Sequence, residues 1–527
     1  MPVLPKSLMV LGASIQTART ARCLRRPRTA LPEQWQAFQT LVAQLALTEV
    51  GRSVEIESRT DYAHFRTGVP VRGYEEFAPH IERMKRGAGN VLWPGQCSLY
   101  VTSSGTTGHI KSLPVTSAMH RHFREARLAS LFFYTARAGH SSIFRGRHLM
   151  VGGSTALKRI PSANAFSAKD GNLCGIKASA MPEWTVRYLA EPSQETSELS
   201  DWTTKLDTIA AGAGQSDVTL IAGFPNWVLD LAEVMNGSSN GGTQPQRNLQ
   251  AVWPNLECFM HSGVPVGPFH DELRQAFGPA VKFHEVYSAA EGFIAAQDTE
   301  ASAGLRLMTG VGLFFEFISL YDFNAYGRLA LGEKAVPLEH VRTGIDYVIL
   351  LTTPAGLCRY VLGDVVRFIS TEPPRLVYVG RTELQLNAFG ERIMEKELTD
   401  ILVTVCNRHR WTVKNFHVAP VIINSLTGQS HGRHEWWVEL RPGTTETPTG
   451  PLLAIELDRE LLARNADYQT KRNSGSLDTP LVRLVMPGLF KHWMCSKEKW
   501  GDENKMPRCR SDRLIADELM AIACFTD

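Results

Sequence analysis

The sequence predicts an α/β domain followed by a smaller α+β domain. Between about residues 90 and 380, short β-rich runs alternate with helical stretches, which is the pattern of βαβ units and of a largely parallel sheet packed by helices. A structure-breaking segment at 371–374, one further strand and a polar turn mark the end of this domain. We therefore expect a large domain over residues 1–380 and a small domain over residues 381–527.

Hydrophobic periodicity and turn residues predict the individual elements. Apolar residues recur near every 3.6 positions from 33 to 50, which predicts an amphipathic helix. In the large domain we expect strands at 97–102, 218–224, 256–261, 281–287 and 347–352 and helices at 118–135 and 226–235. Segments 162–178 and 236–248, rich in Gly, Ser, Asn and Gln, read as surface loops. In the small domain we expect helices at 394–406 and 455–471 and strands at 413–423, 434–440 and 481–486.

Composition excludes several classes of protein. With 527 residues, 43% hydrophobic and 21% charged, the chain is typical of folded globular proteins rather than of collagen, coiled coils or disordered chains. A net charge of +3 is too small for the basic stripe that nucleic-acid binding needs, and no apolar run approaches the ~20 residues that cross a bilayer. The nine scattered cysteines never form a CxxC pair, which favours a reducing cytoplasm.

The strongest local motif is a strand that runs into a loop rich in hydroxyl side chains and glycine. The loop and its flanks comprise Ser103, Ser104, Gly105, Thr106, Thr107, Gly108 and Lys111. The glycines let the backbone approach an anion, the N–H and hydroxyl groups donate hydrogen bonds, and the lysine adds charge. The Walker A pattern is absent, so a P-loop kinase or GTPase is not favoured. The motif predicts phosphate binding, and a turn without a ligand is the alternative.

Two further motifs carry a carboxylate at a defined place. Glu291 follows a β-rich run at a strand end, where α/β sheets bind ligands, and it could hold Mg²⁺ between phosphates. Asp364 follows Gly363 at a turn, and a fixed carboxylate can accept two hydrogen bonds from a ribose diol. Taken alone, the first of these motifs would read as an ordinary strand end.

Several residues near these motifs are interpreted as structural. His120 and His122 are two positions apart on a predicted helix, so they point to different faces and do not form a metal pair. His434 falls on a strand next to two tryptophans and lacks the HExxH context. The Cys358 thiol reads as packing, because nothing in the sequence would lower its pKa.

The phosphate loop looks like that of the adenylate-forming superfamily, which includes acyl-CoA synthetases, adenylation domains and luciferases. Further segments resemble the auxin-responsive acyl acid amido synthetases, known as the Gretchen Hagen family. They lie at 90–95, 113–116, 223–227, 253–256, 262–264, 287–292, 356–366, 380–393, 465–468 and 504–508. These segments follow the family's order from about residue 30 to 515, so the resemblance covers nearly the whole chain.

The resemblance implies an adenylate-forming fold that uses ATP and Mg²⁺, with a small mobile C-terminal domain that carries the adenylation lysine. Catalytic roles fall on Lys505, Glu291 and Lys111, with Glu291 also the magnesium ligand. Outside the phosphate loop, the resemblance assigns nucleotide binding to Gly263, Val264, Tyr287, Ser288, Asp364, Arg367 and Arg381. Two departures stand out: Ala290 lies where the family has a Ser or Thr that contacts the α-phosphate, and Asp502-Glu503 replaces Gly-Gln before the lysine.

The activity implied by this resemblance is an ATP-dependent acyl acid amido synthetase. A carboxylic acid attacks the α-phosphate of ATP to give an acyl-adenylate and pyrophosphate, and an amine, expected to be an amino acid, then displaces AMP. A hinge at 380–384 would let the small domain rotate between the two half-reactions. An acyl-CoA ligase that forms a thioester is the first alternative. An inactive nucleotide-binding scaffold, suggested by the two departures, is the second.

Overall fold

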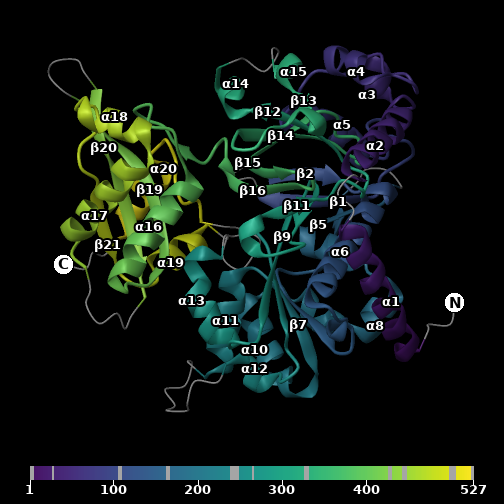
Figure 1. Cartoon of the computed structure of the whole chain (residues 1–527), viewed down its shortest axis with the longest axis horizontal. Coiled ribbons are helices and arrows are strands. Elements are labelled where there is room, and N and C mark those ends of the chain that lie inside the picture. The colour runs from purple at the N-terminus through teal and green to yellow at the C-terminus, as the bar shows by residue number, and fades with distance from the viewer. Residues whose placement is uncertain are drawn as a thin grey trace. The chain divides into compact units, whose positions relative to one another are not determined.

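The computed structural model describes residues 5–25, 29–104, 110–161, 166–237, 248–263, 266–325, 331–424, 430–441, 448–497 and 506–523. The chain divides into two compact units (Figure 1). The N-terminal unit comprises Met1–Leu362 with Val366–Val377, and the C-terminal unit comprises Gly363–Val365 with Tyr378–Asp527.

The described helices of the N-terminal unit are α1 (Lys6–Leu24), α2 (Ala30–Leu45), α3 (Glu49–Ser53), α4 (Tyr62–Gly68), α5 (Tyr74–Lys85), α6 (Ser117–Ala138), α7 (Leu173–Ser179), α8 (Glu183–Tyr188), α9 (Gln194–Glu198), α10 (Trp202–Gly212), α11 (Pro225–Met235), α12 (Leu249–Val252), α13 (His270–Phe277), α14 (Leu320–Ala325) and α15 (Leu331–Lys334). The helix expected over 33–50 is interrupted after Leu45. Thr48 explains the break, because its side chain accepts a hydrogen bond from Gly51 N and caps α3.

The strands that lie in this unit or begin there are β1 (Leu99–Ser104), β2 (Ile110–Pro114), β3 (Arg147–Val151), β4 (Lys158–Ile160), β5 (Ala168–Gly171), β6 (Ala190–Glu191), β7 (Val218–Gly223), β8 (Cys258–His261), β9 (Lys282–Ala289), β10 (Gly292–Ala296), β11 (Leu305–Leu307), β12 (Phe314–Ser319), β13 (Val336–Pro337), β14 (Asp346–Thr352), β15 (Tyr360–Thr371) and β16 (Pro374–Arg381). They form a four-stranded sheet in the order β2-β1-β5-β4. A twelve-stranded sheet has the order β13-β12-β14-β15-β16-β11-β10-β9-β8-β7-β3-β6.

The larger sheet is parallel in one part and antiparallel in another. Strands β6, β3, β7, β8 and β9 pair in parallel, as the βαβ pattern predicts. The expectation of a largely parallel sheet holds for this part only, since β9 pairs antiparallel with β10, β10 with β11, and β12 with β13 and β14. Only two residues join β9 to β10, and a connection that short cannot make a parallel crossover.

Both faces of the parallel part of the sheet are covered by helices. Alternating side chains of its strands pack against these helices. Ile221 and Phe259 pack on one face with α10, α11 and α13, whereas Leu220 and Met260 pack on the other with α1 and α6. Figure 1 shows these two helical layers on opposite sides of the strands. Each fully buried side chain of this size contributes ~1.5–3 kcal/mol of hydrophobic free energy. The sheet is therefore a rigid base for groups at its strand ends.

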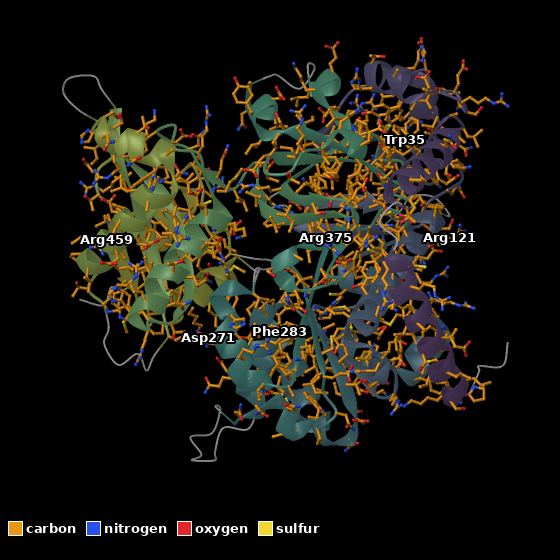
Figure 2. The ribbon with its side chains drawn as sticks, in the orientation of Figure 1. Trp35, Arg121, Asp271, Phe283, Arg375 and Arg459 are labelled. Carbon is orange, nitrogen blue, oxygen red and sulfur yellow. The ribbon has the colours of Figure 1, made fainter. Side chains whose placement is uncertain are left out.

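A buried ion-pair cluster stabilises the antiparallel part of this sheet. The buried carboxylate of Asp298 accepts hydrogen bonds from Arg375, labelled in Figure 2, at 3.0 and 2.9 Å and from Arg306 at 3.2 Å. Two guanidinium groups thus compensate one buried charge, which would otherwise cost several kcal/mol.

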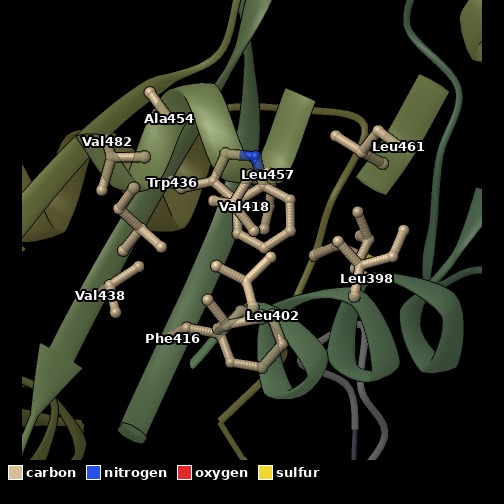
Figure 3. Close-up of a cluster of buried hydrophobic side chains, with 14 of the residues drawn as sticks. Leu398, Leu402, Phe416, Val418, Trp436, Val438, Ala454, Leu457, Leu461 and Val482 are labelled. Carbon is tan, nitrogen blue, oxygen red and sulfur yellow. The ribbon is translucent and has the colours of Figure 1, made fainter. Parts of the chain in front are cut away.

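The C-terminal unit has its own core. Its described elements are β17 (Gln385–Leu386), β18 (Ile393–Met394), α16 (Glu395–His409), β19 (Val413–Asn424), β20 (Ser430–Leu440), α17 (Gly450–Arg464), α18 (Ala466–Asn473), β21 (Leu481–Val485), α19 (Leu489–Ser496) and α20 (Leu514–Ile522). Strands β19 and β20 pair antiparallel and β21 adds in parallel. In Figure 3, Leu402 of α16 and Leu457 of α17 pack with Phe416, Val418 and Trp436.

One helix expected in this unit is divided into two. The pattern at 455–471 predicted a continuous helix, but α17 ends at Arg464 and α18 begins at Ala466. Asn465 lies between them with extended backbone, and its side chain accepts a hydrogen bond from Tyr468 N at 2.7 Å. This cap starts a new helix at a place that apolar spacing cannot reveal.

Candidate active site

The predicted phosphate loop lies between two paired strands. Ser103 of β1 lies opposite Lys111 of β2 in an antiparallel hairpin, and β5 pairs in parallel with β1 on its other side. The Lys111 ammonium lies 5.9 Å from the centre of the Tyr74 ring. Of the expected phosphate ligands, Gly105, Thr106, Thr107 and Gly108 lie outside the described residues, as do Val264 and Lys505, and Ser104 is described by its backbone only.

The hairpin formed by β9 and β10 holds the expected magnesium ligand. Glu291 lies in the turn after β9, and its residue is only 8% exposed. The phenolic hydroxyl of Tyr360 donates a hydrogen bond to Oε1 of Glu291 at 3.2 Å. A buried carboxylate with one fixed oxygen suits Mg²⁺, which binds few protein ligands and completes its octahedron with phosphate oxygens and water. Among the described residues, no cluster of three or more His, Cys, Asp or Glu side chains forms a protein-only metal site.

His122 ties α6 to this hairpin. Its Nδ1 donates to the carbonyl oxygen of Val311 at 2.7 Å, and its Nε2 accepts from Phe293 N, two residues after Glu291, at 2.8 Å. Burial lowers the pKa of His122 to about 4, although the hydrogen bond to Val311 acts in the opposite direction. The imidazole is therefore neutral at pH 7, with both nitrogens used.

Lys177 contacts the same hairpin and was missed by sequence reasoning. Its Nζ donates a hydrogen bond to Oγ of Ser288 at 2.8 Å, at the end of β9. The segment 162–178 had been expected to be a surface loop, and this was wrong for its described part, which contains β5 and α7. Its polar and glycine-rich composition concealed these elements. The signal that could have found α7 is Asn172, a favourable cap residue three positions before Gly175.

Gly263 lies just after β8 in a conformation that requires glycine. Its φ is +79°, and a Cβ at this position would lie 2.5 Å from the Phe224 ring. Phe224 in turn stacks on Trp227 of α11, with ring centres 4.2 Å apart. Tyr287, which the resemblance also assigns to nucleotide binding, is half-buried on β9. The carboxyl ends of β8 and β9 are adjacent in the parallel part of the sheet, so Gly263 and Tyr287 belong to the same edge.

The expected ribose ligand lies in the C-terminal unit and is paired with the expected arginine. Nε of Arg381 lies 2.7 Å from Oδ1 of Asp364, which is 1% exposed. The turn expected at Asp364 was wrong, because Gly363 and Asp364 lie within β15. Thr382 N, just after β16, donates to the carbonyl oxygen of Gly363 at 2.8 Å. Burial raises the pKa of the neighbouring Tyr378 well above its usual value, and the negative charge of Asp364 adds to this. The chain thus brings Asp364 and Arg381 together in one polar cluster.

Arg367 has a different environment. It lies in the N-terminal unit, where its guanidinium makes two hydrogen bonds with the carboxylate of Asp346, at 2.7 and 2.9 Å. A bidentate pair of this geometry orients the guanidinium firmly.

Of the residues interpreted as structural, His434 and Cys358 are buried like His122, whereas His120 is only half-buried. His434 is fully buried, and its Nε2 lies 3.1 Å from Oε1 of Glu391, which also accepts from the backbone of Ala388. Burial raises the pKa of Cys358 to about 12, so the thiol is unreactive at neutral pH. Among the described residues, no helix is both long and apolar enough to span a bilayer.

Family models match most of this chain in three consecutive parts. The GH3 family N-terminal domain matches residues 28–282, the GH3 family central domain 306–381 and the GH3 family C-terminal domain 396–514. This chain belongs to the GH3 family. The resemblance read from the sequence motifs is thereby confirmed.

Among curated GH3 relatives, the chain is 23% identical to an indole-3-acetic acid-amido synthetase, GH3.8, of Oryza sativa subsp. indica, over 90% of this chain and 87% of the relative. It is also 23% identical to a jasmonoyl–L-amino acid synthetase, JAR6, of Nicotiana attenuata, over 87% and 86% of the two chains.

Solved structures share the fold. The acyl acid amido synthetase AtGH3.15 in complex with 2,4-DB has a TM-score of 0.75 at 17% identity, over 99% of this chain and 98% of that chain. A 2-hydroxyisobutyryl-CoA ligase has a TM-score of 0.58 at 13% identity, over 96% and 91%. The fold is thus that of adenylate-forming enzymes, as the sequence predicted.

Proposed function

We propose that this GH3 protein is an ATP-dependent acyl acid amido synthetase. It activates a carboxylic acid as an acyl-adenylate with release of pyrophosphate, and it transfers the acyl group to an amine, an amino acid in our proposal, with release of AMP. The observation that carries the proposal is the family match over residues 28–514, in which the named relatives are amide-forming synthetases.

The proposed nucleotide site combines the groups described above. The pyrophosphate of ATP binds at the loop between β1 and β2, the adenine lies near Gly263 and Tyr287, and the ribose hydroxyls donate to Asp364. The full set of phosphate-loop ligands is Ser103, Ser104, Gly105, Thr106, Thr107, Gly108 and Lys111. Val264, Ser288, Arg367 and Arg381 complete the nucleotide-binding set in this proposal.

Mg²⁺ is part of the proposal, and the carboxylate of Glu291 is its protein ligand. Bound there, the ion would neutralise charge on the phosphate oxygens. The protein's part is to hold the carboxylate in place, and Tyr360 does so through its hydrogen bond to Oε1. Lys505 supplies the remaining positive charge as the acid oxygen attacks the α-phosphate and negative charge builds up there.

The acyl group reacts first with ATP and then with an amine at the same site. We propose that a small domain, residues 381–527, rotates between these two half-reactions. Lys505 belongs to this domain and would leave after adenylation through a hinge at 380–384. Hinges are a few residues that absorb a change in φ and ψ, and such motion commonly gates a two-step enzyme. A cytoplasmic location is also part of the proposal, because the described cysteines are all free thiols, which suits a reducing compartment.

An acyl-CoA ligase is the second candidate, and the fold shared with a CoA ligase favours it. Both functions share the adenylation step, and the acceptor decides between them. The test is mass spectrometry of products after incubation with ATP, Mg²⁺ and a panel of aromatic, indolic and aliphatic acids, with either mixed amino acids or CoA. An amide that requires an amino acid supports the synthetase, and a thioester without an amide overturns it.

A matched pair of variants links the product to the proposed site. Glu291→Gln should abolish product formation, since the amide cannot replace the carboxylate as a cation ligand. Glu300→Gln changes an exposed carboxylate of the same unit and should retain wild-type activity. Pyrophosphate release that is absent for every acid, in a protein that still binds ATP, would support an inactive scaffold instead.

A further inference from the structure

His417 of β19 donates a hydrogen bond from Nδ1 to the carbonyl oxygen of Pro507 at 2.7 Å. Pro507 follows Lys505 by two residues in the chain. From this contact we propose that His417 is a positioning residue, which anchors the chain directly after Lys505 and thereby supports adenylation. This inference rests on the proposed function, and it deepens that function by naming what holds the segment next to the lysine.

The segment after Lys505 pairs with the edge of the sheet formed by β19, β20 and β21. Val418 N donates to the carbonyl oxygen of Arg508 at 2.8 Å, and Arg510 N donates to that of Val418 at 3.1 Å. Val418 and Cys509 thus form a parallel bridge. Because β19 lies at one edge of the sheet, the segment supplies partners to backbone groups that β20 does not reach.

Side chains of this segment are buried on both faces of the sheet. Met506 packs with Trp437 in one hydrophobic cluster, whereas Cys509 packs with Val418, labelled in Figure 3, in the main core of the unit. The backbone after Lys505 is therefore held by both its hydrogen bonds and its side chains. Since Lys505 is bonded to Met506, this anchor limits the positions that the lysine backbone can reach.

His417 contributes a polar contact that an apolar side chain cannot make. Burial lowers the pKa of His417 to about 4, although the hydrogen bond to Pro507 acts in the opposite direction. The ring is therefore neutral at pH 7 with its proton on Nδ1, because a carbonyl oxygen only accepts. Nε2 is buried without a hydrogen-bond partner among the described residues, which costs free energy. The bond to Pro507 is thus what distinguishes His417 from an apolar residue in the same place.

The anchor should matter for one half-reaction. His417 and Pro507 belong to the C-terminal unit, as Lys505 does, so the contact stays with the lysine when the small domain moves. Without the contact, a smaller fraction of molecules would hold the lysine ready for the α-phosphate, and orientation of this kind contributes directly to rate. Amidation, in which Lys505 takes no part, should not depend on it.

The test compares His417→Leu with His417→Asn. Leucine fills the apolar site without a donor, whereas the asparagine amide offers an N–H close to the place of Nδ1 and should keep the bond. His492→Leu, which replaces an exposed histidine of α19, is the matched control. Three quantities are measured: pyrophosphate release, amidation from supplied acyl-adenylate, and hydrogen–deuterium exchange of peptides that span 506–513.

We expect His417→Leu to slow adenylation and to speed exchange in 506–513 by ~3–10-fold each, the equivalent of one hydrogen bond, and to leave amidation unchanged. His417→Asn and His492→Leu should both resemble the wild type.

The outcomes separate this inference from the proposed function. Unchanged exchange in His417→Leu overturns the anchor, whether or not the protein is active. Faster exchange with unchanged adenylation overturns the positioning role, and so do equal losses of both half-reactions, because they indicate a general structural defect. A wild type that releases no pyrophosphate with any acid overturns the proposed function and with it the role in adenylation, while the exchange data still decide whether His417 holds the segment.

Discussion

Tyr360 donates a hydrogen bond to Glu291 across 69 positions of sequence, at 3.2 Å between buried atoms. Tyr360 opens β15, and its ring centre lies 6.0 Å from that of Phe77 in the core of the N-terminal unit. The carboxylate in the turn between β9 and β10 is therefore oriented by a fully buried residue from a strand that is distant in sequence. This hydrogen bond preorganises the Glu291 carboxylate as a ligand.

Replacing Tyr360 with Phe tests this contact. The ring remains and the hydroxyl is lost, so Glu291 loses one hydrogen bond, which is worth about 0.5–1.5 kcal/mol. We expect the magnesium concentration for half-maximal pyrophosphate release to rise by ~3–10-fold with the fold retained. Tyr321→Phe removes an exposed hydroxyl of the same unit and should leave the magnesium dependence unchanged. An unaltered dependence in Tyr360→Phe would show that the hydrogen bond does not position the carboxylate.

Replacing Asp364 with Asn tests the ribose contact. The variant loses the negative charge that pairs with Arg381 and one acceptor for the ribose diol. We expect KM for ATP to rise by ~10-fold or more, the effect of one or two hydrogen bonds to a charged group. The wild type should prefer ATP over 2′-deoxy-ATP, and the variant should lose most of that preference.

The ratio of KM for 2′-deoxy-ATP to KM for ATP is informative, because a general loss of stability would weaken the binding of both nucleotides equally. Asp271→Asn, at the exposed site labelled in Figure 2, is the matched control. An Asp364→Asn variant that keeps the full preference for ATP over 2′-deoxy-ATP would contradict the assignment of the ribose to Asp364.

His122 should remain neutral down to about pH 4. Because its pKa is lowered in the folded state, the unfolded chain binds the extra proton first, and its contribution to stability is lost as pH falls from about 6.5 toward 4. We expect a Nδ1-protonated neutral ring in the NMR spectrum at pH 6. His122→Gln should reduce the loss of unfolding free energy over this range by at most roughly 3 kcal/mol.

The control for this prediction is His64→Gln, whose ring is 81% exposed and should make little difference to the slope. Other buried histidines also lower the unfolding free energy as the pH falls. The contribution of His122 is therefore obtained by comparing the variants with the wild type. Protonation of His122 near pH 6.5 in the folded protein would contradict its place between Val311 and Phe293.

Lys505 should act in one half-reaction only. We expect Lys505→Ala to reduce adenylation by ~10²–10³-fold, the scale seen when one transition-state donor is removed. Amidation from supplied acyl-adenylate should change much less. Equal loss of both half-reactions in Lys505→Ala would contradict its assignment to adenylation.

Local sequence patterns predicted much of this fold because periodicity and capping act over a few residues. Strands β7, β8, β9 and β14 and helices α6 and α11 lie within two or three residues of their predicted places. The antiparallel part of the large sheet was not evident, since pairing depends on distant partners. The break at Asn465 was hidden because the apolar spacing continues through it.

The candidate site was predictable where a motif is contiguous and hidden where it depends on tertiary contact. Glu291, Asp364 and Arg381 could be named from short motifs, and the ion pair between the last two could not. Tyr360 lies in the segment 356–366 that resembles the family, but the motif assigns it no role, and Lys177 lies in a segment that looked like a loop. Both reach the β9–β10 hairpin only through the packing of α7 and β15, which no local pattern encodes.

The most direct test of the synthetase proposal follows the oxygen atoms of the acid. Acids labelled with ¹⁸O in the carboxylate are incubated with ATP, Mg²⁺, amino acids and the protein, and AMP and the product are analysed by mass spectrometry. Attack of the carboxylate on the α-phosphate transfers one labelled oxygen to AMP and leaves the other in the amide. We therefore expect ¹⁸O-labelled AMP in equal amount to the amide. Amide formation with unlabelled AMP, or with the label in inorganic phosphate, would contradict an acyl-adenylate intermediate.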